Sequence, residues 1–246
     1  FKNINCPTKV LDEQLSLDKD HKLYDEELLD VIYQNKNVSF ELALSRWNNN
    51  RTSRIDSLFS HHDLALPHIQ KSILEYGKDY PKLRLAGYKN ISISSMNELA
   101  KAGVMDIRKF LASNPNISPE VMKVLSEDYD SDVRKSLAAN LNISPEVMKV
   151  LSEDYHYDVR ESLAENPNIS PEVIEKLSSN IWSVREALAA NPNISPEVMK
   201  VLSEDNDSDV RRSLAANPNI STEILAILMQ DKDEKVRLAA RARRKT

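Results

Sequence analysis

One short segment recurs along the chain, and this repetition constrains the fold more than any other feature of the sequence. The segment from Asn191 to Arg211 reads NPNISPEVMKVLSEDNDSDVR; close copies begin at Asn114, Asn140 and Asn166, and a partial copy begins at Asn217. Successive copies are 26, 26, 25 and 26 residues apart. A unit of this length is one supersecondary element that cannot bury its apolar face alone, so neighbouring units must stack. The sequence therefore predicts a solenoid.

Each unit carries the signals of a helix start. A Ser-Pro-Glu triplet places a capping hydroxyl, a proline that needs no N–H and an acidic side chain at the positive end of the helix dipole. In the copy at Asn114 the apolar residues Val121, Met122, Val124 and Leu125 follow, which predicts a short helix with a broad buried stripe. The serines of the four triplets are Ser118, Ser144, Ser170 and Ser195.

A second helix follows in each unit. In the same copy it is expected to begin near Ser131 and Asp132 and to end at Asn140, because Asn tolerates the left-handed conformation of a helix end. Only 3 glycines in 246 residues leave little material for β-turns. We expect an all-α fold, with two helices in every repeat and with packing between repeats stabilising helices that are marginal alone.

The period also reaches into the less regular first part of the chain. Ile91 lies 26 residues before Ile117, Pro67 aligns with the next step back, and Phe40 stands where later copies have proline. We count nine units and predict degenerate, capping repeats over residues 1–90 and regular repeats over 91–246. Since ten of the 14 aromatic residues precede residue 115, the early units are expected to pack around larger side chains.

The repeated string VRxSLAxNPNxSPExxxxLSxD resembles the leucine-rich repeat variant family, a bacterial helical repeat. The resemblance is clear over residues 91–240 and faint over 1–90. It implies a right-handed superhelix of alternating α-helices and shorter helices without a sheet, similar in appearance to HEAT repeats. Some relatives carry an N-terminal iron–sulfur module rich in cysteine, but Cys6 is the single cysteine here.

Several polar residues recur once per unit. Each recurring arginine follows an acidic residue by two positions in most units, and residues i and i+2 of a helix point apart. We therefore expect these acids, Asp106, Asp132, Asp158 and Asp209, to pair with arginines of adjacent units in a structural ladder, with an anion-binding groove as the alternative. The arginines of the ladder are Arg108, Arg134, Arg160, Arg185, Arg211 and, in the last unit, Arg237.

Residues with catalytic or metal-binding potential are few. His61, His62 and His68 cluster without the spacing of a zinc motif, and Cys6 has no recurring histidine partner. No glycine-rich phosphate loop is present. We expect no enzyme activity, no metal and no cofactor. No apolar run approaches the roughly 18 residues of a membrane span, and one cysteine makes the cytoplasm the default location.

Positions that vary while the repeat frame stays constant are the candidates for partner contact. The loop before the second helix carries aromatic residues in adjacent units, and aromatic residues are typical interface anchors. The alternative for Tyr155 and Trp182 is that they fill space left by the one-residue deletion in the unit at Asn166. The predicted contact residues are Tyr129, Tyr155, Tyr157 and Trp182 in the loops, with Glu161 and Glu186 at a variable, exposed helix position.

The chain ends on a basic segment. Residues 231–246 have a net charge of +4, whereas the whole chain has −5, so residues 1–230 have −9. An acidic body repels nucleic acid, and basic residues at a helix end also suit the helix dipole. We expect a non-catalytic scaffold that presents its repeat surface to another protein, with nucleic-acid binding through Arg241, Arg243 and Arg244 as the alternative.

Overall fold

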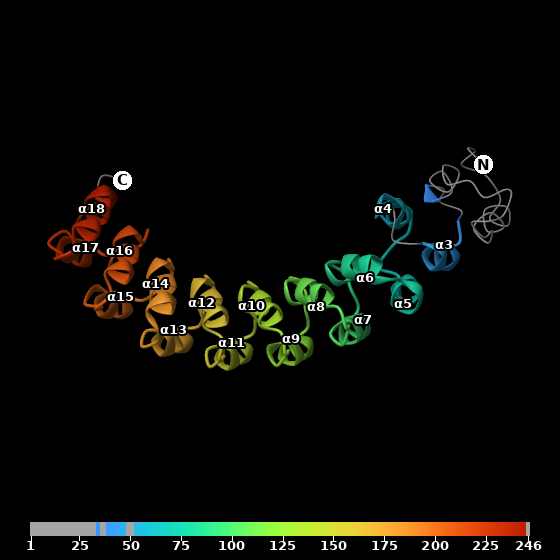
Figure 1. Cartoon of the computed structure of the whole chain (residues 1–246), viewed down its shortest axis with the longest axis horizontal. Coiled ribbons are helices and arrows are strands. Elements are labelled where there is room, and N and C mark those ends of the chain that lie inside the picture. Colours follow the sequence, from blue (N-terminus) through green and yellow to red (C-terminus); the bar gives the residue numbers. More distant parts are fainter. Residues whose placement is uncertain (1–32, 35–37, 48–51, 245–246) are drawn as a thin grey trace. The chain divides into compact units, whose positions relative to one another are not determined.

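The computed structural model is all-helical over the residues that it describes, which are 33–34, 38–47 and 52–244 (Figure 1). These residues contain helices joined by short turns and no strand, and successive helices pack in chain order. The predicted all-α repeat solenoid is confirmed. The right-handed superhelix implied by the family resemblance stays a prediction, and Cys6 and the first predicted unit lie outside the described residues.

The helices form consecutive pairs, one pair per repeat. The chain divides into two compact units, residues 1–118 and 119–246, and the boundary between degenerate and regular repeats at residue 90 stays a prediction. In the first unit the helices are α3 (Phe40–Arg46), α4 (Thr52–His61), α5 (Pro67–Tyr76), α6 (Asp79–Ala86), α7 (Ile93–Leu99) and α8 (Met105–Ala112). In the second they are α9 (Pro119–Ser126), α10 (Ser131–Ala138), α11 (Pro145–Leu151), α12 (Tyr157–Glu165), α13 (Pro171–Leu177), α14 (Trp182–Ala190), α15 (Pro196–Ser203), α16 (Ser208–Ala216), α17 (Thr222–Leu228) and α18 (Glu234–Arg243).

The predicted helix starts are mostly capped as expected. Ser144 and Ser195 accept hydrogen bonds from the backbone N–H groups of Val147 and Val198, each at 3.3 Å. Ser170 is an exception, because its Oγ is buried without a hydrogen-bond partner among the described residues. The Ser-Pro-Glu triplet therefore sets where these helices begin, even where the hydroxyl makes no cap.

In the second unit the even-numbered helices lie in one row and the odd-numbered helices in another (Figure 1). The rows enclose a thin core of Val, Leu and Ala, in which Val133 and Leu137 of α10 are fully buried. The expectation that Val124 belongs to the buried stripe of α9 is wrong, because half of its surface is exposed. At the same position on α11 and α15, Val150 and Val201 are also exposed, so each helix buries a narrower stripe than the sequence suggested.

Buried asparagines join neighbouring repeats within each unit. Asn191 ends α14, and its Nδ2 donates to the carbonyl oxygens of Ala164 at 2.7 Å and Asn166 at 2.9 Å in the preceding repeat. Its Oδ1 accepts from the N–H of Asn193 in its own turn. One side chain thus closes a turn and satisfies two buried carbonyls of its neighbour. Asn114, Asn166 and Asn217 make the same set of bonds.

In the first unit larger side chains fill the core, as the distribution of aromatic residues predicted. Phe40 packs against Phe59 with ring centroids 6.0 Å apart, and both are buried. Gln70 of α5 links its repeat to the following one. Its Nε2 donates to the carbonyls of Leu64 and Asn90, and its Oε1 accepts from Ser92 and Ser95.

Replacing Asn191 by Ala is expected to lower the free energy of unfolding by about 1–3 kcal/mol, because two buried carbonyls lose their donor. Urea unfolding followed by circular dichroism at 222 nm measures this change. The matched control is Asn193→Ala, which removes a bond from an exposed side chain to the carbonyl of Pro167 and should cost much less. Equal losses from the two variants would show that the buried amide has no special role.

Candidate interaction surface around Arg160

Arginine–aspartate pairs connect successive repeats in the second unit. Nε and Nη2 of Arg211 donate to the two carboxylate oxygens of Asp231 at 2.7 and 3.0 Å, and Nη1 donates to the carbonyl of Asp205 at 2.7 Å. This bidentate geometry favours charge-assisted hydrogen bonds. Arg134 pairs in the same way with Asp154, and Arg185 pairs with Asp205.

The aspartates of these pairs are not the ones expected from the sequence. The prediction placed Asp106, Asp132, Asp158 and Asp209 opposite the arginines. The partners in the second unit are instead Asp154, Asp205 and Asp231, each of which follows the first helix of the next repeat. Asp209 instead contacts Arg212 on its own helix at 2.5 Å. Arg108, in the first unit, donates Nη1 to the carbonyl of Ala102 at 2.7 Å. That these arginines fix the register of the stack stays a prediction.

Burial strengthens the Arg211–Asp231 pair. Only 4% of the Arg211 side chain and 8% of the Asp231 side chain are exposed. The hydrogen bonds from Arg211 hold the pKa of the Asp231 carboxyl below its ordinary value, although burial acts in the opposite direction. The bond to Asp231 likewise raises the pKa of Arg211. Both groups are therefore charged in the folded protein at neutral pH.

Arg160 breaks this pattern. Its Nε donates to Oδ1 of Asn180 at 3.1 Å, and its Nη1 donates to the carbonyl of Asp154. Asn180 stands where the other repeats have Asp154, Asp205 and Asp231. Among Arg134, Arg160, Arg185 and Arg211, the guanidinium of Arg160 alone faces a neutral side chain in the following repeat.

The predicted aromatic contact residues lie on the surface, before or at the start of α10, α12 and α14. Tyr157 and Trp182 are the first residues of α12 and α14, and 49% and 51% of their surfaces are exposed. Tyr129 and Tyr155 are each 75% exposed. The ring of Tyr155 lies 4.7 Å from the guanidinium carbon of Arg134, at a distance suited to a cation–π contact. That Tyr155 and Trp182 fill space left by the deletion stays the alternative prediction, and half of the Trp182 surface is exposed.

The two helices that begin with an aromatic residue also lack a capping side chain. Asp130, Asp207 and Asp233 cap α10, α16 and α18 by accepting backbone N–H bonds. The corresponding residues before α12 and α14 are His156 and Ile181, which make no side-chain cap. The loss of two caps and the gain of two exposed aromatics in adjacent repeats mark this edge of the stack as different from the rest.

Glu161 and Glu186 are less exposed than predicted. Both are half-buried on the row of even-numbered helices, and Glu186 lies 3.8 Å from a guanidinium nitrogen of Arg212. Burial, together with the neighbouring carboxylates of Glu165 and Asp158, raises the pKa of Glu161. These two side chains therefore add negative charge to the row of even-numbered helices, partly offset by Lys135 and Arg212.

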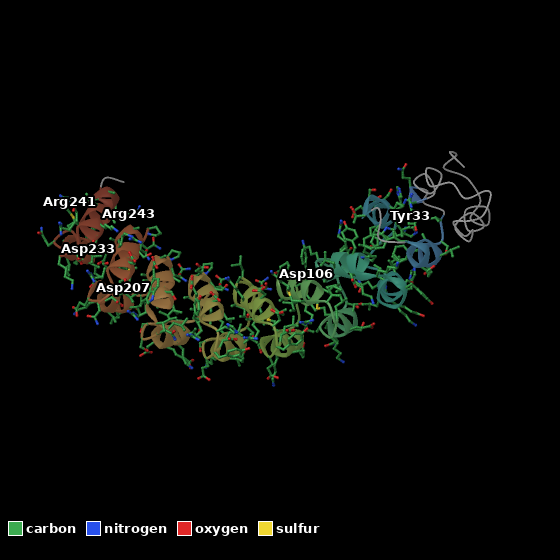
Figure 2. All side chains as sticks on the ribbon, in the orientation of Figure 1. Tyr33, Asp106, Asp207, Asp233, Arg241 and Arg243 are labelled. Carbon is green, nitrogen blue, oxygen red and sulfur yellow. The ribbon has the colours of Figure 1, made fainter. Side chains whose placement is uncertain are left out.

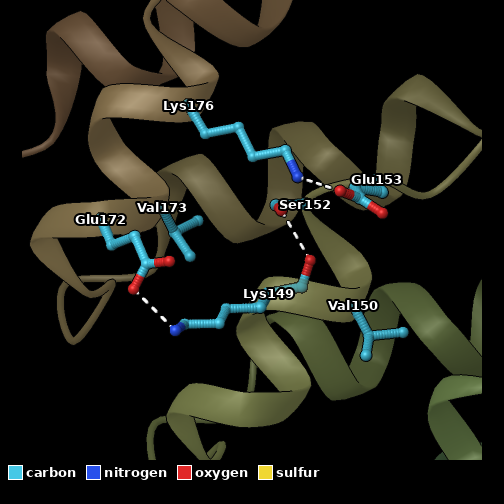
Figure 3. A pocket seen from close by; sticks show the side chains of 7 residues that line it. All are labelled: Lys149, Val150, Ser152, Glu153, Glu172, Val173 and Lys176. Atoms are coloured by element: carbon cyan, nitrogen blue, oxygen red, sulfur yellow. Dashed lines mark hydrogen bonds and ion pairs between the residues drawn. The ribbon is translucent and has the colours of Figure 1, made fainter.

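The opposite row of helices carries shallow grooves between repeats. One groove of about 290 Å³ lies between α11 and α13 (Figure 3). Lys149 pairs with Glu172 at 2.7 Å, and Lys176 pairs with Glu153, so both ion pairs bridge adjacent repeats. Exposed pairs of this kind contribute at most about 1 kcal/mol each. We therefore interpret this groove as the junction between two repeats and not as a ligand site.

The histidines and the basic end show no site of their own. Nδ1 of His62 lies 2.9 Å from the carbonyl of Leu58, and its ring packs on Phe40. Within the described residues no group of three or more His, Cys, Asp or Glu is arranged to hold a metal. Arg241 and Arg243 lie in the last turn of α18 (Figure 2), where Nη2 of Arg243 donates to the carbonyl of Pro218. No helix in the described part of the chain is long and apolar enough to cross a bilayer.

Some residues of this surface were missed in the sequence. The interacting aspartates Asp154, Asp205 and Asp231 occupy one alignment column, and Asn180 is its exception. A comparison of that column alone would have found Asn180. It could not have shown which side chain faces the column, because the arginine lies 20 residues earlier in the chain.

Acid is expected to weaken the Arg211–Asp231 pair. Since the folded-state pKa of Asp231 is lowered, its contribution to stability is present above the unfolded value of about 3.9 and is lost as the pH falls through the folded value. Asp231→Asn should reduce the free energy of unfolding by about 1–3 kcal/mol at pH 7 and flatten its decline below pH 4. Urea unfolding at a series of pH values measures both effects. The exposed Glu204, changed to Gln, is the control and should leave the decline unchanged.

Comparison with known families supports the repeat assignment. Residues 158–214 match the model of the Leucine Rich Repeat Variant domain. The matched segment begins in α12 and ends in α16, so it contains Arg160, Asn180 and Trp182. A comparison with curated proteins finds no match. The match over residues 158–214 agrees with the family resemblance that the repeated motif predicted.

Proposed function

We propose that this protein is a non-catalytic scaffold that binds another protein through the edge of the stack at the start of α12 and α14. The observation that carries the proposal is the pair of half-exposed aromatics, Tyr157 and Trp182, at the first positions of neighbouring helices. A helical repeat domain suits this role because its stacked units present an extended surface of regular spacing.

Three further features support this surface. Large aromatic side chains are the commonest energetic anchors of protein interfaces. Helices α12 and α14 lack the side-chain cap that aspartates provide to α10, α16 and α18, and a missing cap typically costs about 1 kcal/mol. Tyr155, which follows the end of α11, extends the aromatic surface toward Arg134. We define Tyr155, Tyr157 and Trp182 as the aromatic edge.

Alanine at Tyr157 and Trp182 together is expected to abolish partner binding, because each buried aromatic anchor typically contributes about 2 kcal/mol or more. Both side chains are half exposed, so the helical circular dichroism signal should not change. Affinity capture from cells that make the protein, with quantitative mass spectrometry, identifies proteins bound by the wild type and lost by the variant.

The control for this capture is Tyr76→Ala, which removes an exposed aromatic at the end of α5 in the first unit. It should retain the partner. Partners captured equally by all three proteins would argue against the aromatic edge, and loss of helical signal in the double variant would show that these rings stabilise the fold instead.

Nucleic-acid binding through Arg241, Arg243 and Arg244 is the alternative. Arg243 already donates to the carbonyl of Pro218, and the chain before residue 231 is acidic, so the described contacts favour an end cap. Fluorescence anisotropy with unrelated DNA and RNA oligonucleotides distinguishes the two. Affinity that falls steeply between about 50 and 200 mM salt would support the alternative, and we expect no such binding.

A further inference from the structure

We propose that the guanidinium group of Arg160 binds a carboxylate side chain of an acidic peptide segment in the partner, seated between Tyr157 and Trp182. This inference deepens the proposed function and rests on it. It states the chemistry of the segment that the aromatic edge recognises.

The repeat that follows Arg160 supplies no carboxylate to its guanidinium group. In the pairs of Arg134, Arg185 and Arg211, the following repeat supplies an aspartate with two acceptor oxygens and a negative charge. Opposite Arg160 it supplies Asn180, which is neutral and has one acceptor oxygen. That oxygen already accepts from the N–H of Ile181 at 3.0 Å and from Nε of Arg160 at 3.1 Å.

One N–H donor of Arg160, Nη2, is left without an acceptor among the described residues. Nη2 donates to a carboxylate oxygen in Arg134, Arg185 and Arg211, at 2.8–3.0 Å. Nη2 of Arg160 makes no hydrogen bond with any residue that the structure describes. Arg160 is half-buried, so its charge is neither fully solvated nor paired. An external carboxylate would supply the partner that the repeat itself supplies elsewhere.

The helix of Arg160 and the helix beside it both begin with an aromatic residue. Tyr157 and Arg160 are three residues apart on α12, so they lie on the same face of the helix. Trp182 follows Asn180 by two residues and begins α14, which packs beside α12. Each of the two helices next to the Arg160–Asn180 contact thus begins with an aromatic residue, and apolar surface near a guanidinium restricts access of water, which strengthens its interaction with an anion.

The charges nearby decide which kind of anion fits. Asp158 and Glu161 lie on α12 with Arg160, and Glu186 lies on α14; burial and the neighbouring carboxylates raise the pKa of Glu161, although Lys135 acts in the opposite direction. Their combined charge repels a nucleic acid or another polyanion. A single carboxylate flanked by apolar side chains meets one guanidinium and two aromatic rings without that repulsion, so a peptide is favoured.

The test uses the full chain and a display library of random twelve-residue peptides. The three tightest peptides selected by the wild type are synthesised, and each is also made with every Asp and Glu replaced by Asn and Gln. Binding of both forms is measured for the wild type, Asn180→Asp and Arg160→Gln. Asn180→Asp supplies an internal carboxylate to Arg160, as in the other repeats. Asn206→Asp is the matched control, because it adds the same charge to the exposed loop one repeat later.

The wild type and Asn206→Asp should bind the acidic peptides about tenfold or more tightly than their amide forms. Asn180→Asp and Arg160→Gln should lose that preference, and Asn180→Asp should melt at the same temperature as the wild type or higher. Equal binding of acidic and amide forms, or an unchanged preference in Asn180→Asp, would overturn the proposal. So would selective displacement of the peptides by single-stranded RNA.

The aromatic variants separate this inference from the proposed function. Peptides that need Tyr157 and Trp182 but bind equally well as amides would leave the scaffold proposal standing and remove the carboxylate site. An acidic preference that survives alanine at both aromatics would contradict both proposals, because the carboxylate would then bind without the aromatic edge. If the library yields no peptide that binds, both proposals fail.

Discussion

The side-chain amide of one buried asparagine per repeat is the contact on which the stack depends. A pair of helices of seven to nine residues, such as α13 and α14, is too short to be stable in isolation. Apolar packing between repeats supplies the driving force, but it does not by itself fix how far one repeat slides along the next. Asn191 fixes that position, because its two hydrogen bonds to the preceding repeat satisfy carbonyls that burial would otherwise leave without donors.

The arginine–aspartate pairs add a second link between repeats, and the exception among them is informative. Removing one charge from a buried pair leaves the other uncompensated, which is usually costly. Asn180 nevertheless replaces the aspartate in one repeat, and the same repeat has lost one loop residue and its capping aspartate. These changes and two exposed aromatics occur within a few residues of each other. Such local departures from the repeat pattern, within an otherwise regular stack, are typical of functional sites.

Much of the fold could be predicted from the sequence because each repeat contains residues that mark where its helices begin and end. Pro145, Pro171 and Pro196 each begin a helix as predicted, since proline fixes a helical φ and needs no N–H partner at that position. The exposed aromatics Tyr157 and Trp182 were also identifiable, because they break a column of polar residues. Side-chain contacts between repeats were harder to predict from the sequence. The arginines pair with Asp154 and Asp231 and not with the predicted aspartates, because these partners belong to another repeat. Val124 was predicted to lie in the core but is half exposed, because a helical pattern gives the width of a buried face only approximately.

The sequence by itself determined the period, the helix pairs and the order in which they pack, because each of these follows from local signals repeated at a fixed spacing. Only the tertiary structure decided which side chains meet between repeats. Arg160 and Asn180 are 20 residues apart, and their contact depends on the rotation and rise from one repeat to the next. Those two quantities are set by the packing of apolar side chains from both repeats at once, and a single repeat contains only half of that information.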